Sequence, residues 1–344
     1  MKALVLEDKQ HFEVRDIEKP TISENQVLVN VSYCGVCGSD LDRYFKGKVH
    51  FFPMILGHEF SGVIEEVGDK VTFFSAGNRV AVAPLVPCDQ CENCLRGKPS
   101  HCEKYSFIGS REKGAMAEYV AVDERNLIHV PEEVSLEEAA LIEPLTVAMH
   151  GIERINFAAG SEAVIFGAGT IGMMTLLALK ARGAGDITVI DINSEKLNVA
   201  RELGATETVN SQQTDLHEYF ANHNKPAIVF ETAGVAQTQR QCIEVADHTG
   251  KVVYIGTATS TVEFPPEVFE QILRKELEIA GSWMSYSTPF PGYEWKAGLQ
   301  YIKDGIIDVK PLIDEIFELE DKEKPFDRMK DPSSSSIKYL YKID

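Results

Sequence analysis

The middle of the chain alternates short apolar runs with longer helical patterns. Residues 163–166 are apolar and precede a glycine-rich turn, a second long apolar stretch and the run "DITVID". Short apolar runs bounded by turn residues predict buried strands, and the longer apolar stretch predicts a helix. "AIVFETAG", "KVVYIGT" and "ELEIAGSW" continue this alternation. Strands that alternate with helices predict an α/β fold with a doubly wound parallel sheet.

Two further patterns predict helices, and the end of the alternation predicts a domain boundary. "SEKLNVARELGA" is amphipathic, with Ser194 as the predicted N-cap and Gly204 at its end. "LEEAALIEP" is helix-like, and Pro144 is expected to stop or kink it. The alternation ends near Trp283, so the remaining tail is expected to rejoin the N-terminal part. We therefore predict a cofactor domain over 150–284 and a second domain formed by 1–149 with 285–344.

The glycine-rich turn has the context that a dinucleotide-binding motif requires. The sequence Gly167-Ala-Gly169-Thr-Ile-Gly172 lies between a predicted strand and a predicted helix, and Asp191 follows nineteen residues after Gly172. Free N–H groups at a helix N-terminus bind phosphate, and an acidic residue at this spacing binds the adenosine ribose and disfavours a 2′-phosphate. We therefore expect NAD in preference to NADP. The candidate cofactor-binding residues are Gly167, Gly169, Thr170, Ile171, Gly172, Asp191, Lys196 and Gly256.

Length and charge narrow the class of protein. A chain of 344 residues is long for one core and suits two domains. The net charge of −19 argues against a nucleic-acid partner, because nucleic-acid binding needs clustered cations. The uncharged stretch 163–179 carries three glycines and fits the strand–turn–helix better than a membrane span. The start "MKALVLEDKQ" does not resemble a signal peptide, so we expect a cytoplasmic protein.

Four of the seven cysteines lie within one short segment, 88–102. Cys88, Cys91, Cys94 and Cys102 follow the spacing C-x2-C-x2-C-x7-C. A disulfide knot is disfavoured in a reducing compartment. An iron–sulfur cluster is the rival metal group, but the x7 gap and the absence of a proline after the last cysteine disfavour it. Four thiolates leave no open position on zinc, so we predict a structural zinc lobe.

A second set of metal-ligating residue types is spread over three segments. "CGVCGSD" contains Cys37, "LGHEF" contains His58 and Glu59, and "LIEPLTVAMH" contains Glu143. A thiolate, an imidazole and a carboxylate provide three protein ligands and leave the open position that a catalytic zinc needs. Cys34 and Cys242 are expected to be buried thiols without a chemical role.

These motifs together resemble a known family. "GVCGSD", "LGHEFSGVIEEVG", the cysteine lobe, "EPLTVAMH" and "GAGTIG" occur here in the order seen in zinc-dependent medium-chain alcohol and polyol dehydrogenases, and the likeness spans essentially the whole chain. Glutamate in "EPLTVAMH" resembles the polyol branch. The resemblance implies a β-rich GroES-like catalytic domain with a Rossmann domain, two zinc ions per chain, NAD, and a homodimer or tetramer. Closer likeness in "FIGSREKGAMAEY" implies a phosphorylated sugar alcohol as substrate.

The resemblance also implies roles for individual residues. Cys37, His58 and Glu143 would hold the catalytic zinc, Glu59 would replace or orient zinc-bound water, and Ser39 would take the alcohol proton. Asp42 stands where some alcohol dehydrogenases have a relay histidine, so the outer proton route is expected to run through water, Glu59 and Glu143 instead. The candidate phosphate-binding residues are Arg43, Lys46, His50 and Arg111.

Two alternatives remain open at this point. One is a dehydrogenase with the same machinery for a neutral substrate, such as sorbitol, a butanediol or threonine. The other is a non-catalytic NAD-binding sensor or a zinc-independent quinone-reductase-like protein. A protein of the second kind should lack an open zinc site.

Overall fold

The computed structural model describes residues 1–331 and 334–344. The chain divides into two units: unit 1 comprises Met1–Glu143 and Tyr286–Asp344, and unit 2 comprises Pro144–Ser285. Unit 1 is therefore assembled from both ends of the chain. Within the described ranges, no helix has both the length and the apolar character needed to cross a membrane.

Unit 2 is built on a six-stranded sheet in which all neighbouring strands are parallel. The strand order is β13-β12-β11-β14-β15-β16, so the order reverses beside the first strand, as in a Rossmann fold. The predicted α/β fold class with a doubly wound parallel sheet is confirmed. The strands are β11 (Ala163–Phe166), β12 (Ile187–Asp191), β13 (Glu207–Asn210), β14 (Ile228–Glu231), β15 (Lys251–Tyr254) and β16 (Glu278–Gly281).

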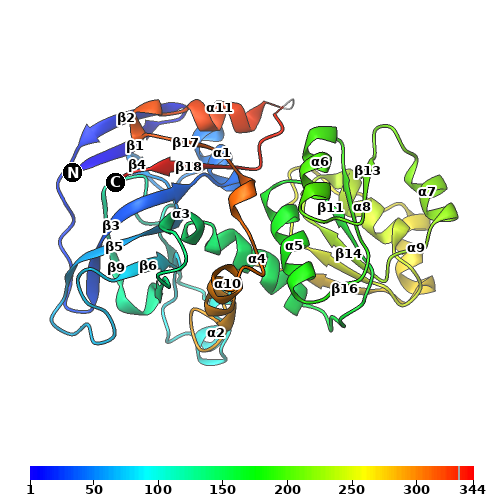
Figure 1. The fold of residues 1–344 in the computed structure, drawn as a ribbon, viewed down its shortest axis with the longest axis horizontal. Helices are drawn as coiled ribbons and strands as arrows, with labels where there is room; N and C mark the ends of the chain where they lie inside the picture. The colour runs from blue at the N-terminus through cyan, green and yellow to red at the C-terminus, as the bar shows by residue number, and fades with distance from the viewer. Residues whose placement is uncertain (332–333) are drawn as a thin grey trace. The chain divides into compact units, whose positions relative to one another are not determined.

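Helices cover both faces of this sheet, and Figure 1 shows α5 and α6 on one side with α7 and α9 on the other. Buried apolar side chains from β11, β14, α7 and α8 form one core cluster of unit 2. The helices are α5 (Thr170–Ala181), α6 (Ser194–Glu202), α7 (Leu216–Asn222), α8 (Ala236–Val245) and α9 (Pro266–Arg274).

The start of α6 differs from the prediction by one residue. Asn193, not Ser194, is the N-cap, because its side-chain oxygen accepts hydrogen bonds from the backbone N–H groups of Glu195 at 3.0 Å and Lys196 at 3.1 Å. Ser194 is the first helical residue. Gly204 lies just beyond the helix with φ +96°, a conformation that favours glycine.

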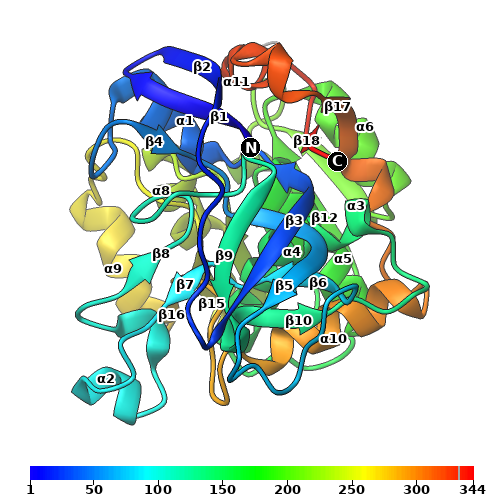
Figure 2. The ribbon, with the colours of Figure 1, turned by 90° about the vertical axis from the view of Figure 1, so that its left-hand side faces the viewer.

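Unit 1 is rich in β-structure, and its largest sheet has seven strands in the order β10-β6-β5-β3-β18-β17, with β9 also paired to β3. Figure 2 shows the long strand β3 beside β9 and β5. Smaller sheets have the orders β2-β1-β4 and β7-β8. The strands are β1 (Lys2–Asp8), β2 (His11–Asp16), β3 (Gln26–Gly35), β4 (Met54–Ile55), β5 (Glu59–Val67), β6 (Arg79–Val82), β7 (Leu85–Val86), β8 (Ser106–Phe107), β9 (Tyr119–Asp123), β10 (Leu127–His129), β17 (Ile313–Phe317) and β18 (Lys338–Lys342).

The C-terminal strand β18 lies inside the large sheet of unit 1. It pairs antiparallel with β3, where Leu340 faces Gly35, and parallel with β17. This pairing brings the last residues of the chain beside the segment that contains Cys37. The helices that begin in this unit are α1 (Gly38–Lys46), α2 (Glu92–Leu95), α3 (Leu136–Ala139), α4 (Ile142–Glu153), α10 (Tyr293–Lys303) and α11 (Lys324–Lys330).

The expectation that Pro144 ends a helix was wrong. The helical stretch breaks earlier, between α3 and α4, and α4 begins at Ile142 and continues through Pro144 to Glu153. Proline is tolerated in a first helical turn because the N–H group that it lacks would have no intrahelical acceptor there. Glu143 therefore lies at the beginning of a helix.

Candidate functional site

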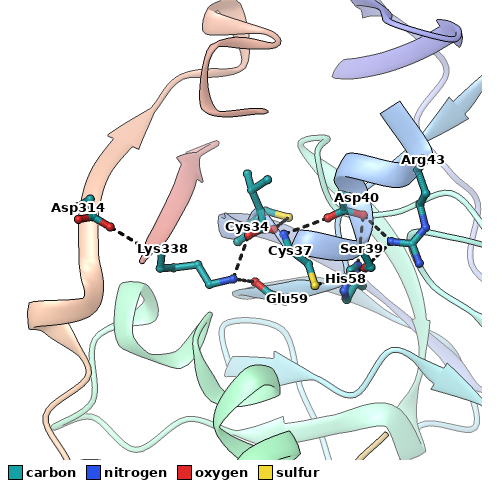
Figure 3. Close-up of polar contacts among 11 residues, drawn as sticks. Cys34, Cys37, Ser39, Asp40, Arg43, His58, Glu59, Asp314 and Lys338 are labelled. Carbon is teal, nitrogen blue, oxygen red and sulfur yellow. Dashed lines mark hydrogen bonds and ion pairs between the residues drawn. The ribbon is translucent and has the colours of Figure 1, made fainter. Parts of the chain in front are cut away.

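Three of the predicted metal-ligating residues converge in unit 1. Cys37 follows β3 and is the N-cap of α1, whereas His58 and Glu59 lie at the start of β5. Strands β3 and β5 are antiparallel neighbours in which Gly35 faces Glu59, so the sheet register brings these segments together. One potential ligand atom from each residue lies within 4.8 Å of the other two. Figure 3 shows Cys37, His58 and Glu59 in this arrangement.

Glu143 is not part of that compact set of atoms, but it is electrostatically linked to it. Burial raises the pKa of Glu143 to about 8; nearby His58 lowers it, and Glu59 and Cys37 raise it further. Burial likewise raises the pKa of Cys37 to about 11, with Glu59 and Asp40 adding to the effect. A divalent cation would favour the charged form of both groups. The thiolate of Cys37, the imidazole of His58 and the carboxylate of Glu143 are donor types that fit a zinc ion.

Asp40 supports the candidate metal site and was not identified from the sequence. Its carboxylate is fully buried, accepts a hydrogen bond from the backbone N–H of Cys37 at 3.2 Å, and lies 3.6 Å from His58 Nδ1. This separation is longer than a hydrogen bond, but it places a carboxylate beside the imidazole, as in metal sites where a carboxylate orients the ligating histidine. Phe107, at the end of β8, packs edge-on against the His58 ring with centroids 5.7 Å apart. Both residues therefore restrict the histidine.

Ser39 and Arg43 form a short network on α1. The hydroxyl of Ser39 donates to Cys37 Sγ at 3.3 Å, and Arg43 Nη1 donates to Ser39 Oγ at 2.9 Å. Arg43 Nη1 also donates to Asp40 Oδ1 at 2.6 Å. One nitrogen of Arg43 is thus bound within the protein, and the guanidinium is held beside Ser39.

The other candidate phosphate-binding residues lie in different surroundings. Lys46 forms an ion pair with Asp42 at 2.7 Å. His50 is exposed in the segment between α1 and β4. The guanidinium of Arg111 stacks over Tyr105 and borders a surface groove of about 700 Å³.

Lys338, on β18, is the second residue that the sequence did not reveal. Its side chain is 1% exposed, and Nζ donates to Glu59 Oε2 at 2.5 Å and to the carbonyl oxygen of Val36 at 2.9 Å. Burial alone would lower the pKa of Lys338, but Glu59, Cys37 and Glu143 together raise it. No local motif surrounds Lys338, and 279 residues separate it from Glu59.

The cysteine lobe is assembled as a second potential metal site. The sulfur atoms of Cys88, Cys91, Cys94 and Cys102 all lie within 4.8 Å of one another, and no cysteine of the described residues is in a disulfide. Backbone N–H groups of Cys94 and Glu103 lower the pKa of Cys91 to about 6. Four sulfur donors with a stabilised thiolate fit a closed, structural zinc site.

The glycine-rich turn in unit 2 leaves space where a phosphate would bind. Gly167 has φ +100°, and a Cβ on Gly172 would lie 1.8 Å from the carbonyl oxygen of Gly167, so both positions require glycine. A Cβ on Gly169 would meet no atom within 4 Å. Gly169 is the N-cap of α5, whose first residues are Thr170 and Ile171. The turn therefore fits a dinucleotide phosphate.

Asp191 lies at the end of β12, next to this turn. Its Oδ2 accepts a hydrogen bond from Ala168 N at 2.6 Å, and its Oδ1 accepts one from Asn193 N at 2.8 Å. Two candidate cofactor-binding residues remain, Lys196 and Gly256. Lys196 lies in the first turn of α6, and Gly256 follows β15, where a Cβ would lie 2.4 Å from Gly234 N.

The fold and these two sites define a zinc-type dehydrogenase with a GroES-like domain and a Rossmann domain. Family models match the chain over residues 23–132, described as an alcohol dehydrogenase GroES-like domain, and over residues 170–303, described as a zinc-binding dehydrogenase. The chain belongs to the zinc-dependent alcohol and polyol dehydrogenase family, as the motifs suggested, and is an oxidoreductase.

Individual relatives include several polyol dehydrogenases. The chain is 39% identical to galactitol 1-phosphate 5-dehydrogenase of Escherichia coli K12, over 91% of this chain and 92% of the relative. It is 32% identical to sorbitol dehydrogenase of Bacillus subtilis 168, over 95% and 93%. The crystal structure of galactitol-1-phosphate dehydrogenase from Escherichia coli matches with a TM-score of 0.95 and 36% identity, over 99% of each chain.

Proposed function

We propose that the protein oxidises a secondary hydroxyl of a sugar-alcohol phosphate with NAD, converting galactitol 1-phosphate to tagatose 6-phosphate. The observation that carries this proposal is the convergence of Cys37, His58 and Glu59 in a buried site linked to Glu143. The likeness to galactitol 1-phosphate 5-dehydrogenase supports the choice of substrate.

Cys37, His58 and Glu143 are the residues that would hold the catalytic zinc, and the four-cysteine lobe would hold a second ion. Zinc supplies positive charge that makes an alcohol proton easier to remove. We assign the first acceptor of that proton to Ser39, whose oxygen already accepts a hydrogen bond from Arg43. Glu59 and Glu143 are the buried carboxylates that could carry the proton onward.

Arg43 is the strongest of the four phosphate-binding candidates. Its side chain is 17% exposed and its guanidinium is fixed through Nη1 beside Ser39, so other guanidinium N–H groups could face a ligand. Lys46 is weaker, because Asp42 already neutralises it. Arg111 is the alternative, and we expect the phosphate to contact Arg43, with Arg111 or His50 as a second cation.

We expect NAD as the cofactor because Asp191 would meet the adenosine ribose, where a carboxylate repels a 2′-phosphate. Gly167, Gly169 and Gly172 would form the pyrophosphate-binding turn. The space over Gly169 and the adjacent N-terminus of α5 support this assignment.

We also propose a homodimer formed through unit 2. Strand β16 is the outer strand of its sheet, so one row of its backbone groups faces no other strand of the described residues. Apolar side chains near it are exposed: Ile279 is 42% exposed, Phe269 55% and Leu273 67%. A second copy would cover this edge and these side chains. We place the enzyme in the cytoplasm, where the free thiols would remain reduced.

A substrate panel tests the proposed function. NADH formation would be measured with galactitol 1-phosphate, galactitol, sorbitol, 2,3-butanediol and threonine, each with NAD and with NADP. The proposal requires the highest kcat/KM for galactitol 1-phosphate with NAD. A higher kcat/KM for an unphosphorylated compound would favour the neutral-substrate alternative. No turnover of any compound by zinc-loaded protein would favour a binding protein.

A further inference from the structure

Two of the carboxylates around Cys37 form ion pairs with positively charged side chains. Asp40 is paired with Arg43 at 2.6 Å, and Glu59 is paired with Lys338 at 2.5 Å. A zinc ion with two positive charges would balance the thiolate of Cys37 and the carboxylate of Glu143, whose electrostatic surroundings also include His58 and Lys338. With neutral His58, these charges make the whole cluster electrically neutral. Burial makes such pairing necessary, because an uncompensated charge in a buried site is costly.

Glu59 is nevertheless close enough to be a metal ligand. One of its carboxylate oxygens lies within 4.8 Å of the potential ligand atoms of both Cys37 and His58. The ammonium group of Lys338 acts electrostatically on both carboxylates, and it donates a hydrogen bond to Glu59 at 2.5 Å.

We propose that Lys338 is a positioning residue that keeps Glu59 from becoming a permanent ligand of the catalytic metal ion. The inference rests on the proposed zinc site. Lys338 Nζ holds Glu59 Oε2 and is itself anchored by the carbonyl oxygen of Val36, directly before Cys37. It therefore competes with a metal ion for the carboxylate. By retaining Glu59, Lys338 leaves a ligand position open for the substrate alcohol.

The fold fixes Lys338 firmly enough for this role. Its backbone N–H donates to Asp314 Oδ2 at 2.9 Å, and β18 pairs with both β3 and β17. Figure 3 shows the side chain extending from β18 to Glu59. The C-terminal strand thus contributes directly to the environment of the metal site.

If Lys338 has this role, its removal should strengthen zinc retention, whereas simple structural damage would weaken zinc retention. In Lys338→Met, a positive charge is lost and the Glu59 carboxylate is freed, so both effects strengthen binding of a cation. Loss of a group that supports metal ligands typically lowers metal affinity by about 10- to 100-fold, and we expect a change of the same size in the opposite direction here, because Lys338 withholds a ligand. We therefore expect zinc loss to a chromophoric chelator to slow by about 10- to 100-fold, while kcat falls. A residue that merely stabilised the fold would make zinc leave faster when removed.

The experiment compares five proteins loaded with zinc: wild type, Lys338→Met, Lys338→Arg, the double variant Lys338→Met with Glu59→Gln, and Lys275→Met. The double variant removes both charges and keeps the site neutral, so its zinc release should return to near the wild-type rate. Lys338→Arg should resemble wild type. Lys275 is a matched control, because it is a buried lysine of unit 2 that donates to three backbone carbonyls.

Cobalt-substituted proteins give a second readout that does not depend on activity. Coordination by Glu59 in Lys338→Met should change the positions and intensities of the visible d–d bands relative to wild type, and Glu59→Gln should reverse the change. Faster zinc release from Lys338→Met, or a cobalt spectrum identical to that of wild type, would overturn the proposal. If wild type itself held zinc only in the cysteine lobe, the proposed catalytic site would fail before Lys338 was tested.

Discussion

Metal-free protein should become less stable as the pH rises, and Glu143 should cause much of this change. In the absence of a cation, burial raises the pKa of Glu143 from 4.5 to about 8. The folded state therefore keeps a proton that the unfolded chain has released across this interval. Because the folded pKa is the higher one, the stabilisation is fully present below pH 4.5 and is lost as the pH rises through 8.

The magnitude follows from the two pKa values. Each pH unit within the interval changes the free energy of unfolding by about 1.4 kcal/mol. Between pH 6.0 and 7.5 the folded carboxyl begins to ionise, so the loss is roughly 2 kcal/mol. Glu143→Gln cannot ionise and should lack this component. Zinc-loaded wild type should lack it as well, because the bound cation stabilises the carboxylate.

The assay is urea unfolding of metal-free wild type and metal-free Glu143→Gln at pH 6.0 and 7.5, followed by circular dichroism. Any effect of emptying the cysteine lobe is common to both proteins and cancels in the comparison. The expected result is a decrease in the free energy of unfolding that is roughly 2 kcal/mol larger for wild type. Equal pH dependence of the two proteins would refute the reasoning.

Three further predictions concern unit 2. Gly172→Ala should lower the melting temperature clearly, because its Cβ would lie 1.8 Å from a carbonyl oxygen. Gly169→Ala should leave the melting temperature unchanged, but it should raise KM for NAD about tenfold because its Cβ would fill the space for the phosphate. Asp191→Asn removes the charge and keeps one oxygen that can accept a hydrogen bond from Ala168 N, although the bond from Asn193 N is then lost. The ratio of kcat/KM for NADP to that for NAD should rise about tenfold, and an unchanged ratio would contradict the assignment of Asp191. Phe269→Asp should convert the dimer to a monomer in light scattering, while Phe73→Asp, at an even more exposed position of unit 1, should not. A monomeric wild type would contradict the dimer.

Features encoded by consecutive residues could be predicted from the sequence. The glycine turn needs only a strand, three glycines and a helix in succession, and the cysteine lobe closes within fifteen residues. The predicted fold class was confirmed, because the alternation of apolar runs with helical stretches reflects the burial of each strand between two helical layers. Each of these features could be predicted because it depends on residues that are close together in the sequence.

Features that depend on distant pairing could not be predicted. Lys338 reaches Glu59 only because β18 pairs with β3, and nothing in "SSSSIKYLYKID" indicates that Lys338 is buried. Nothing in the sequence marks Asp40 as part of a metal site, because only the fold brings it beside His58. The helix break before Pro144 was misplaced because proline is compatible with a first turn as well as with a helix end.

The central claim is that Cys37, His58 and Glu143 hold a catalytic zinc ion, and metal content tests it most directly. Zinc would be measured in wild type and in His58→Ala after dialysis, together with NADH formation from galactitol 1-phosphate. If these three residues hold a catalytic zinc ion, we expect two zinc ions per wild-type chain and one per variant chain, with turnover lost in the variant. A variant that kept both ions and normal turnover would contradict it.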